Sequence, residues 1–158
     1  MNAPLVELKV LDPRLHAWGL PRQRSAQAAA VDLHACLDGP LTLRPGDPAA
    51  LIPAGFALHI NDPHIAAVIL PRSGAGHERG LVLGNLAGLV DPDFTGPVRI
   101  SAWNRNAPGT WSVVIEPGER IAQMIFLPIL RPVFEVVAEF SAPSERGAGG
   151  WGSTGEGA

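Results

Sequence analysis

The stretch "AALIPAGFALHINDPHIAAVILP", residues 49–71, contains two apolar runs separated by Asn61, Asp62 and Pro63. Each run has the length of a strand and shows no helical periodicity. Asn and Asp side chains bond to nearby backbone amides, and proline fixes its own φ, so the three residues between the runs favour a tight turn. The stretch therefore predicts two strands connected by that turn.

The same pattern recurs along the chain, with breaks at Pro-Gly, Asp-Pro-Asp and Pro-Gly-Glu, which are also turn sequences. The one short helical candidate is "SGAGHERG", residues 73–80. Many short strands with tight turns predict an all-β barrel or a double-sheet jelly roll. The other strand-like runs are "LVELKVL" (5–11), "VDLHACL" (31–37), "LTL" (41–43), "LVLGN" (81–85), "GLVD" (88–91), "VRISAWN" (98–104), "WSVVIEPG" (111–118), "RIAQMIFLPIL" (120–130) and "VFEVVAEF" (133–140).

Composition narrows the class of protein. A chain of 158 residues with 46% hydrophobic residues fits one globular domain, and a net charge of -3 argues against nucleic-acid binding. Cys36 is the single cysteine, so no internal disulfide can form, which fits a reducing compartment. We also find no signal peptide in "MNAPLVELKVLDP" and no apolar stretch of membrane-spanning length. We expect a cytoplasmic protein with no membrane partner.

The segment "LPRSGAGHERGLVLGN", residues 70–85, carries a candidate anion site. If residues 73–78 form a helical turn, its first amides point outward with partial positive charge, and Arg72 beside Ser73 and Gly74 adds a bidentate donor. The alternative is a surface turn with a solvated arginine. The segment is not a P-loop, because it lacks the Walker spacing and lysine.

The segment "GLVDPDFTGPV", residues 88–98, has two aspartates around Pro92. One interpretation is a hairpin whose Asp side chains bond to turn amides. The other places one carboxylate at the mouth of a pocket, where it could orient and deprotonate water, with Phe94 as a flat apolar wall.

Two polar residues interrupt apolar strands. Gln123 needs a partner, either in a core or subunit contact or as a donor to a phosphate oxygen or a reacting water. Asp32 in "AVDLHA" either faces solvent or lies near a metal. The histidines have no metal-ligand spacing, and no serine or cysteine has the context of a nucleophile.

The chain ends in "RGAGGWGSTGEGA", residues 146–158. A glycine-rich end is ordinarily frayed and without function. Here it carries an arginine and two hydroxyl groups, which suit phosphate oxygens, and Trp151, which suits a flat ring. We therefore expect a strap that closes over a flat, phosphorylated ligand.

Taken in order, "AVDLHA", "PRSGAGHERGLVLGN", "GLVDPDFTGPV", "PGERIAQMIFLP" and "RGAGGWGSTG" resemble the five sequential motifs of the trimeric dUTPases, and the similarity extends over residues 6–155. The resemblance implies a β jelly-roll homotrimer with active sites at the subunit junctions. Residues 1–143 would form the catalytic domain, and residues 144–158 a flexible lid over a neighbouring site. The implied reaction is hydrolysis of dUTP to dUMP and pyrophosphate, with Mg²⁺ held mainly by the triphosphate. It would limit uracil incorporation into DNA and supply dUMP for thymidylate synthesis.

The resemblance also implies roles for individual residues. Asp91 would activate the water that attacks the α-phosphorus, and Asp32 would touch the water shell of the metal. The residues that would bind phosphate are Arg72, Ser73, Gly74, Gln123, Arg146, Ser153 and Thr154. Those that would bind base and sugar are Asn85, the hairpin backbone of residues 88–98 including Gly88, Leu89 and Val90, and the rings of Phe94 and Trp151.

The chain departs from the family pattern at Phe94 (usually Tyr), Trp151 (usually Phe) and Ala30 (usually Gly). A dCTP deaminase of the same fold is the nearest alternative, and the tail "GGWGSTG" argues against it. A non-catalytic nucleotide-binding trimer is another, and the presence of Asp91, Arg72 and Gln123 argues against that.

Overall fold

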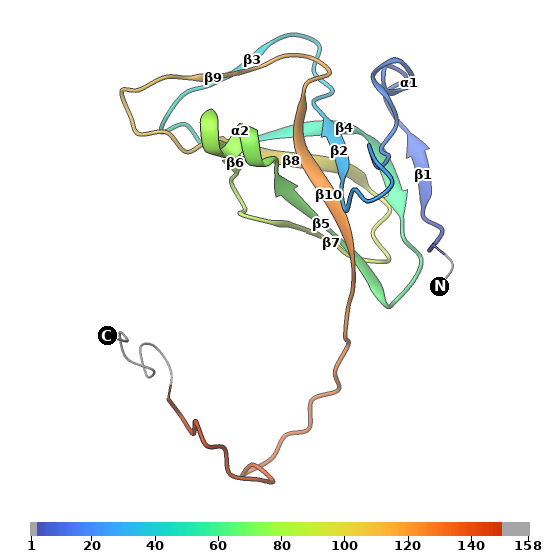
Figure 1. Ribbon diagram of the computed structural model, residues 1–158, viewed down its shortest axis with the longest axis vertical. Coiled ribbons are helices and arrows are strands. Elements are labelled where there is room, and N and C mark those ends of the chain that lie inside the picture. Colours follow the sequence, from blue (N-terminus) through green and yellow to red (C-terminus); the bar gives the residue numbers. More distant parts are fainter. Residues whose placement is uncertain (1–2, 150–158) are drawn as a thin grey trace.

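The computed structural model describes residues 3–149 of the protein and consists almost entirely of antiparallel β-structure (Figure 1). Its elements, in chain order, are β1 (Glu7–Val10), α1 (Leu15–Trp18), β2 (Val31–His34), β3 (Leu41–Leu43), β4 (Ala50–His59), β5 (Ile65–Pro71), α2 (Ser73–Glu78), β6 (Leu81–Leu83), β7 (Gly88–Val90), β8 (Pro97–Asn104), β9 (Val113–Ile115) and β10 (Arg120–Pro128). The all-β prediction is confirmed.

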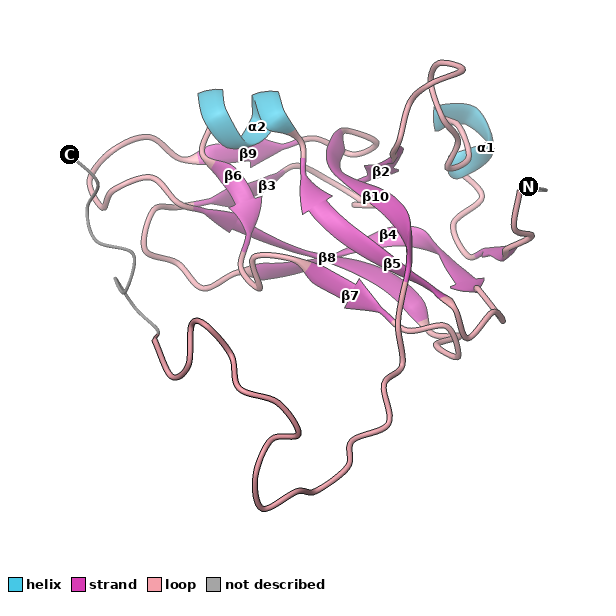
Figure 2. Ribbon diagram, turned by 60° about the horizontal axis from the view of Figure 1, so that its bottom comes forward, coloured by secondary structure: helices cyan, strands magenta, loops and turns pink. Residues whose placement is uncertain are grey.

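The strands form two four-stranded sheets, with orders β1-β4-β8-β6 and β2-β10-β5-β7, and a two-stranded ribbon of β3 and β9 (Figure 2). The two apolar runs of residues 49–71 are strands, but β4 and β5 belong to different sheets. The turn between them crosses from one sheet to the other. Asn61 adopts φ 53° there and its N–H donates to Pro92 O at 3.0 Å, while Asp62 Oδ1 accepts from His64 N at 2.9 Å.

One hydrophobic core contains side chains from both four-stranded sheets. Phe56 and Ile52 come from β4, Leu33 from β2, Ile100 from β8 and Met124 from β10, and all are buried. Buried and more exposed residues alternate along β8, whereas five consecutive residues of β4, 54–58, are buried. The burial of these side chains is the main favourable term in folding.

Strand prediction from sequence is wrong for "VFEVVAEF", residues 133–140, and misses the single helical turn α1. In the described chain, residues 129–149 contain no helix or strand and run away from the sheets as an extended arm (Figure 1). A strand needs a neighbouring strand to pair with, and alternating apolar residues do not supply one. The short helix expected at residues 73–80 is confirmed as α2.

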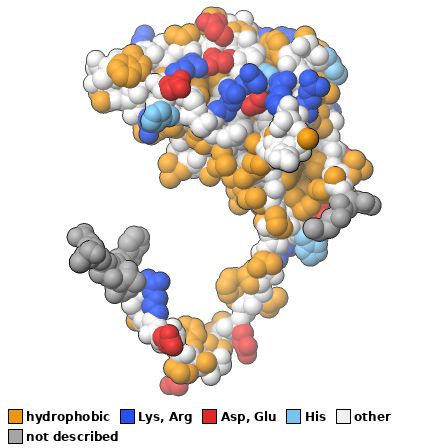
Figure 3. Space-filling model, in the orientation of Figure 1, with side chains coloured by type: hydrophobic (Ala, Val, Ile, Leu, Met, Phe, Trp, Pro, Cys, Tyr) orange, Lys and Arg blue, Asp and Glu red, His pale blue; other side chains and the backbone are white. Residues whose placement is uncertain are grey.

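The arm, residues 129–149, exposes many large apolar side chains, seen as hydrophobic atoms along its length in Figure 3. They include Leu130, Val133, Phe134, Val136 and Phe140. Exposed apolar runs of this size are typical of surfaces that interact with another molecule.

Within residues 3–149, no helix has both the length and the apolar character needed to cross a bilayer.

Candidate active site

A cavity of about 310 Å³ lies between β7 and β8. The hairpin predicted for residues 88–98 is not formed, because β7 pairs with β5 whereas β8 pairs with β4 and β6 in the other sheet. The cavity brings together most of the residues that the sequence assigned to base and sugar binding. Its lining residues are Ile69, Asn85, Gly88, Leu89, Val90, Asp91, Phe94, Pro97, Val98 and Arg99. Ile69 and Arg99 were not predicted from the sequence, because neither belongs to one of the motifs. They reach the cavity only through the pairing of the strands that carry them.

Strand pairing fixes the wall of this cavity. β7 pairs with β5 so that Gly88 lies opposite Ile69 and Val90 opposite Ala67. A Cβ added at Gly88 would meet Ile69 Cβ at 3.3 Å, so a side chain here would fill space at the wall. β7 is short, and backbone of residues 88–98 lies at the cavity surface, where it can offer N–H and C=O groups to a ligand.

The turn after β7 positions the aromatic wall. Phe94 N donates to Asp91 O at 3.2 Å, and the Phe94 ring folds back over Gly96. A Cβ at Gly96 would lie 2.7 Å from Phe94 Cζ, so glycine is required for the ring to lie there. Phe94 remains 41% exposed and lines the cavity, so its ring is accessible to a ligand.

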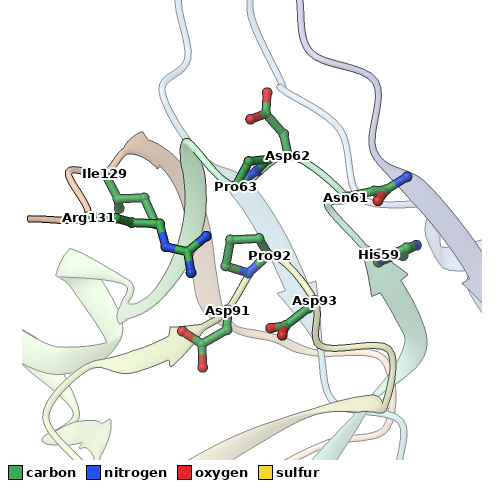
Figure 4. Close-up of a pocket in the computed structure, with 9 residues that line it drawn as sticks. All are labelled: His59, Asn61, Asp62, Pro63, Asp91, Pro92, Asp93, Ile129 and Arg131. Carbon is green, nitrogen blue, oxygen red and sulfur yellow. The ribbon is translucent and has the colours of Figure 1, made fainter. Parts of the chain in front are cut away.

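Asp91 lies at the boundary between this cavity and a second, larger hollow of about 590 Å³ (Figure 4). The second hollow lies between the β4–β5 turn and the start of the arm. Its lining residues are His59, Asn61, Asp62, Pro63, Asp91, Pro92, Asp93, Ile129 and Arg131. Figure 4 shows the Arg131 guanidinium pointing toward Pro92, so the base of the arm contributes a positive charge to the hollow that Asp91 also lines.

The predicted phosphate residues lie around α2. Gly76 N donates to Arg72 O, so the amides of Ser73 and Gly74 precede the first helical hydrogen bond, and no side chain caps them. Beside them is a hollow of about 470 Å³, lined by Arg72, Gly74, Ala75, Glu78, Arg79, Gly118, Glu119 and Arg120. Free amides and guanidinium groups in one hollow suit an anion.

Asp32 is the acidic centre of this region, and three guanidinium groups contact its carboxylate. Arg120 Nη1 lies 2.9 Å and Arg24 Nε 3.6 Å from Oδ2, and Arg72 Nε lies 3.1 Å from Oδ1. Arg24 and Arg120 were not among the predicted site residues. Figure 3 shows basic side chains gathered over β2 and the start of β10, with acidic atoms among them.

Gln123 lies in the same cluster. Gln123 on β10 is paired with Asp32 on β2. Its Nε2 donates to the carbonyl oxygen of Pro71, the residue before Arg72, at 2.9 Å. The amide therefore has a backbone partner in this state. The predicted phosphate residues Arg72, Ser73, Gly74 and Gln123 and the predicted metal-shell residue Asp32 are thus brought together.

His34 lies on the same face of β2 as Asp32 and is buried with no hydrogen-bond partner for Nδ1 within the described residues. Burial lowers the pKa of His34, and the nearby Arg24 lowers it further. The imidazole is therefore neutral near pH 7 and adds no charge to the cluster.

Within one chain, the Asp91 cavity and the Arg72 cluster are separated. Gly88 lies opposite Ile69, three positions before Arg72, and Val90, which precedes Asp91, lies opposite Ala67, five positions before Arg72. At about 3.3 Å per residue, the near end of the cavity is roughly 10 Å from Arg72 along the strand and Val90 is roughly 16 Å from it. Of the predicted tail residues, Arg146 is exposed and donates to Gly149 O at 2.8 Å, while Trp151, Ser153 and Thr154 lie outside the described residues.

Comparison with known proteins adds independent evidence. The family model described as dUTPase matches residues 16–155. A deoxyuridine 5'-triphosphate nucleotidohydrolase of Psychromonas ingrahamii is 52% identical over 152 residues, covering 96% of this chain and 97% of the relative. One of Xanthomonas campestris pv. campestris is 53% identical over 151 residues, covering 95% and 96%.

A solved structure of the Staphylococcus bacteriophage 80alpha dUTPase with dUpNHpp aligns with a TM-score of 0.84 and 25% identity, covering 97% of this chain and 99% of that one. The family match spans nearly the whole chain, and both sequence relatives carry the same description. The chain therefore belongs to the dUTPase family.

Proposed function

We propose that the protein is a dUTP diphosphatase, which hydrolyses dUTP to dUMP and pyrophosphate. Such an activity removes a source of uracil from DNA synthesis and supplies dUMP for thymidylate synthesis. The observation that carries the proposal is the cavity between β7 and β8, which gathers Asn85, the backbone of β7, Phe94 and Asp91 in a chain of this family.

Base selection would come from residues 88–98. Their backbone groups and the Asn85 amide can pair with O2, N3–H and O4 of uracil, whereas cytosine would leave buried groups unpaired, which discriminates strongly. The tight turn after β7 would exclude a 5-methyl group. Phe94 would pack on the sugar and leave a ribose 2′-hydroxyl without a partner.

Chemistry would depend on positioning and charge. Asp91 would orient a water and accept its proton as that water attacks the α-phosphorus. Arg72, Ser73, Gly74 and Gln123 would hold the phosphates, and phosphoryl transfer needs little beyond such placement and neutralisation.

The residues present fit a Mg²⁺ ion carried by the substrate. Among residues 3–149, no group of three or more His, Cys, Asp or Glu side chains is placed to hold a metal by itself. Asp32, beside Arg72 and Gln123, would contact the metal's water shell. When bound, the ion would neutralise charge on the triphosphate oxygens.

We further propose that the subunit is a jelly roll that works as a homotrimer. Two observations support this: the exposed apolar arm needs a covering surface, and the Asp91 cavity lies apart from the Arg72 cluster within one chain. A second copy could supply the missing half of each site. Residues 144–158 would then act as a lid on a neighbouring site, with Arg146, Ser153 and Thr154 on phosphate and Trp151 over the base. The division into residues 1–143 and 144–158 and the cytoplasmic location stay predictions.

The first experiment is incubation of the purified protein with Mg²⁺ and, separately, dUTP, dCTP, dTTP or UTP, followed by ion-exchange separation of the products. Release of dUMP and pyrophosphate from dUTP alone is the expected result. A uracil nucleotide from dCTP would move the protein to the deaminase alternative, and no turnover would leave a binding protein.

The variant Asp91→Asn tests the proposed role of Asp91 in activating the water. It should lower kcat by about 10² to 10⁴, the range of a lost general base, while dUTP still binds. Unchanged turnover would show that Asp91 does not activate the water.

A further inference from the structure

We propose that Arg24 is a positioning residue of the triphosphate site: it keeps the Asp32 carboxylate neutralised when Arg72 and Arg120 turn from it to the phosphates. This inference rests on the proposed function, because it requires a polyphosphate substrate in the hollow beside α2.

The ion pairs divide into two kinds. Arg72 and Arg120 contact Asp32 and also line the hollow. Arg24 contacts the same carboxylate at 3.6 Å but is not among the residues of that hollow. Asp32 does not line the hollow either, so the contact between Arg24 and Asp32 lies outside it, where the Gln23–Val31 bridge holds the segment of Arg24 beside β2.

The Asp32 side chain is only 14% exposed, so its charge needs a partner. In the described state the cluster has three positive charges and one negative charge. If Arg72 and Arg120 both rotated onto phosphates without Arg24, the carboxylate would have no side-chain cation beside it, and only the water shell of the substrate's Mg²⁺ would lie between it and the polyanion. Like charges at short range disfavour binding, and Arg24 reduces that penalty.

Arg72 is also prepared for this exchange. Its Nη1 donates to Arg120 O at 3.1 Å, so a backbone bond can hold the guanidinium at the edge of β10 while Nε changes partner. Arg24 Nε approaches Oδ2, the oxygen that Arg120 would vacate. The vacated oxygen thus has a replacement cation 3.6 Å away.

The test compares Arg24→Ala with Arg24→Lys and with Arg22→Ala. Arg22 is exposed, lies two residues away and forms no ion pair within residues 3–149, so its variant matches the charge change alone. The measurements are kcat and KM for dUTP, the Kd values of inorganic tripolyphosphate and dUMP by calorimetry at low and high salt, and thermal unfolding.

For Arg24→Ala we expect KM and the tripolyphosphate Kd to rise about fivefold, as for loss of one partly exposed charge contact. We expect kcat and the dUMP Kd to stay close to wild type, a weaker salt dependence, and recovery in Arg24→Lys. Arg22→Ala should match wild type.

The proposal is overturned if Arg24→Ala and Arg22→Ala behave alike, if dUMP and tripolyphosphate are weakened equally, or if only the unfolding temperature changes. Failure of the wild-type protein to hydrolyse dUTP would count against the proposed function instead. Tripolyphosphate binding would still report on Arg24 in that case.

Discussion

Replacing Gly55 with alanine should strongly destabilise the protein. Gly55 lies in β4 within the irregular pairing between Pro53 and Ala57, with φ 81°, and its carbonyl accepts from Leu11 N and Asp12 N at 2.8 and 2.9 Å. A Cβ there would lie 2.4 Å from Cys36 Sγ. Alanine therefore meets both an unfavourable backbone conformation and a filled core.

The two effects can be estimated separately. The left-handed conformation costs an L-residue about 1–2 kcal/mol, and overpacking a core costs about 1–3 kcal/mol. The sum, about 2–5 kcal/mol, should lower Tm by roughly 4–20 °C in a domain of this size. Urea unfolding and thermal scans at one fixed protein concentration measure it, because an oligomer's stability depends on concentration.

A second substitution separates the causes. Cys36→Ala in the Gly55→Ala background removes the clashing sulfur, so it should recover the steric part and leave the backbone part. Gly39→Ala is the control, because nothing lies within 4 Å of a Cβ at that position. A Gly55→Ala protein within about 0.5 kcal/mol of wild type, the range of harmless surface changes, would refute the reasoning. So would simple additivity of the two core substitutions.

Three further outcomes are expected. Gly96→Ala should displace the Phe94 ring and raise KM for dUTP with little loss of stability; an unchanged KM would remove Phe94 from sugar binding. Burial raises the pKa of Cys36 from 9.0 to about 11, so the native thiol should resist labelling at pH 8 and react on unfolding; the stability that this shift contributes is present below pH 9 and lost as pH rises toward 11. Deleting residues 146–158 should leave a folded oligomer by size-exclusion chromatography but abolish most turnover, whereas a fully active truncation would contradict the lid.

Local signals in the sequence were enough for most of the fold. The runs that form β4, β5 and β10 are short apolar stretches between turn residues. Such a pattern predicts a strand from neighbouring positions alone. The same kind of pattern wrongly predicted a strand at residues 133–140, because the described chain offers no strand for that segment to pair with.

The residues of the candidate site were also found from the sequence, since each sits in a short motif, but their neighbours were not. Arg24 and Arg120 are ordinary charges along the chain, 8 and 88 positions from Asp32, and only the pairing of β2 with β10 and the path before β2 bring them to one carboxylate. Ile69 and Arg99 join the cavity for the same reason.

By itself, the sequence determined that this protein is built from short antiparallel strands, which motifs it carries and which side chains have the chemistry to bind a nucleotide. Those properties depend on residue type and on spacing of a few positions. The tertiary structure alone decided that β4 and β5 lie in different sheets, that Asp32 holds three arginines, and that the Asp91 cavity lies apart from the Arg72 cluster. Such contacts join residues far apart along the chain, and they are set by sheet register and core packing, which no local pattern encodes.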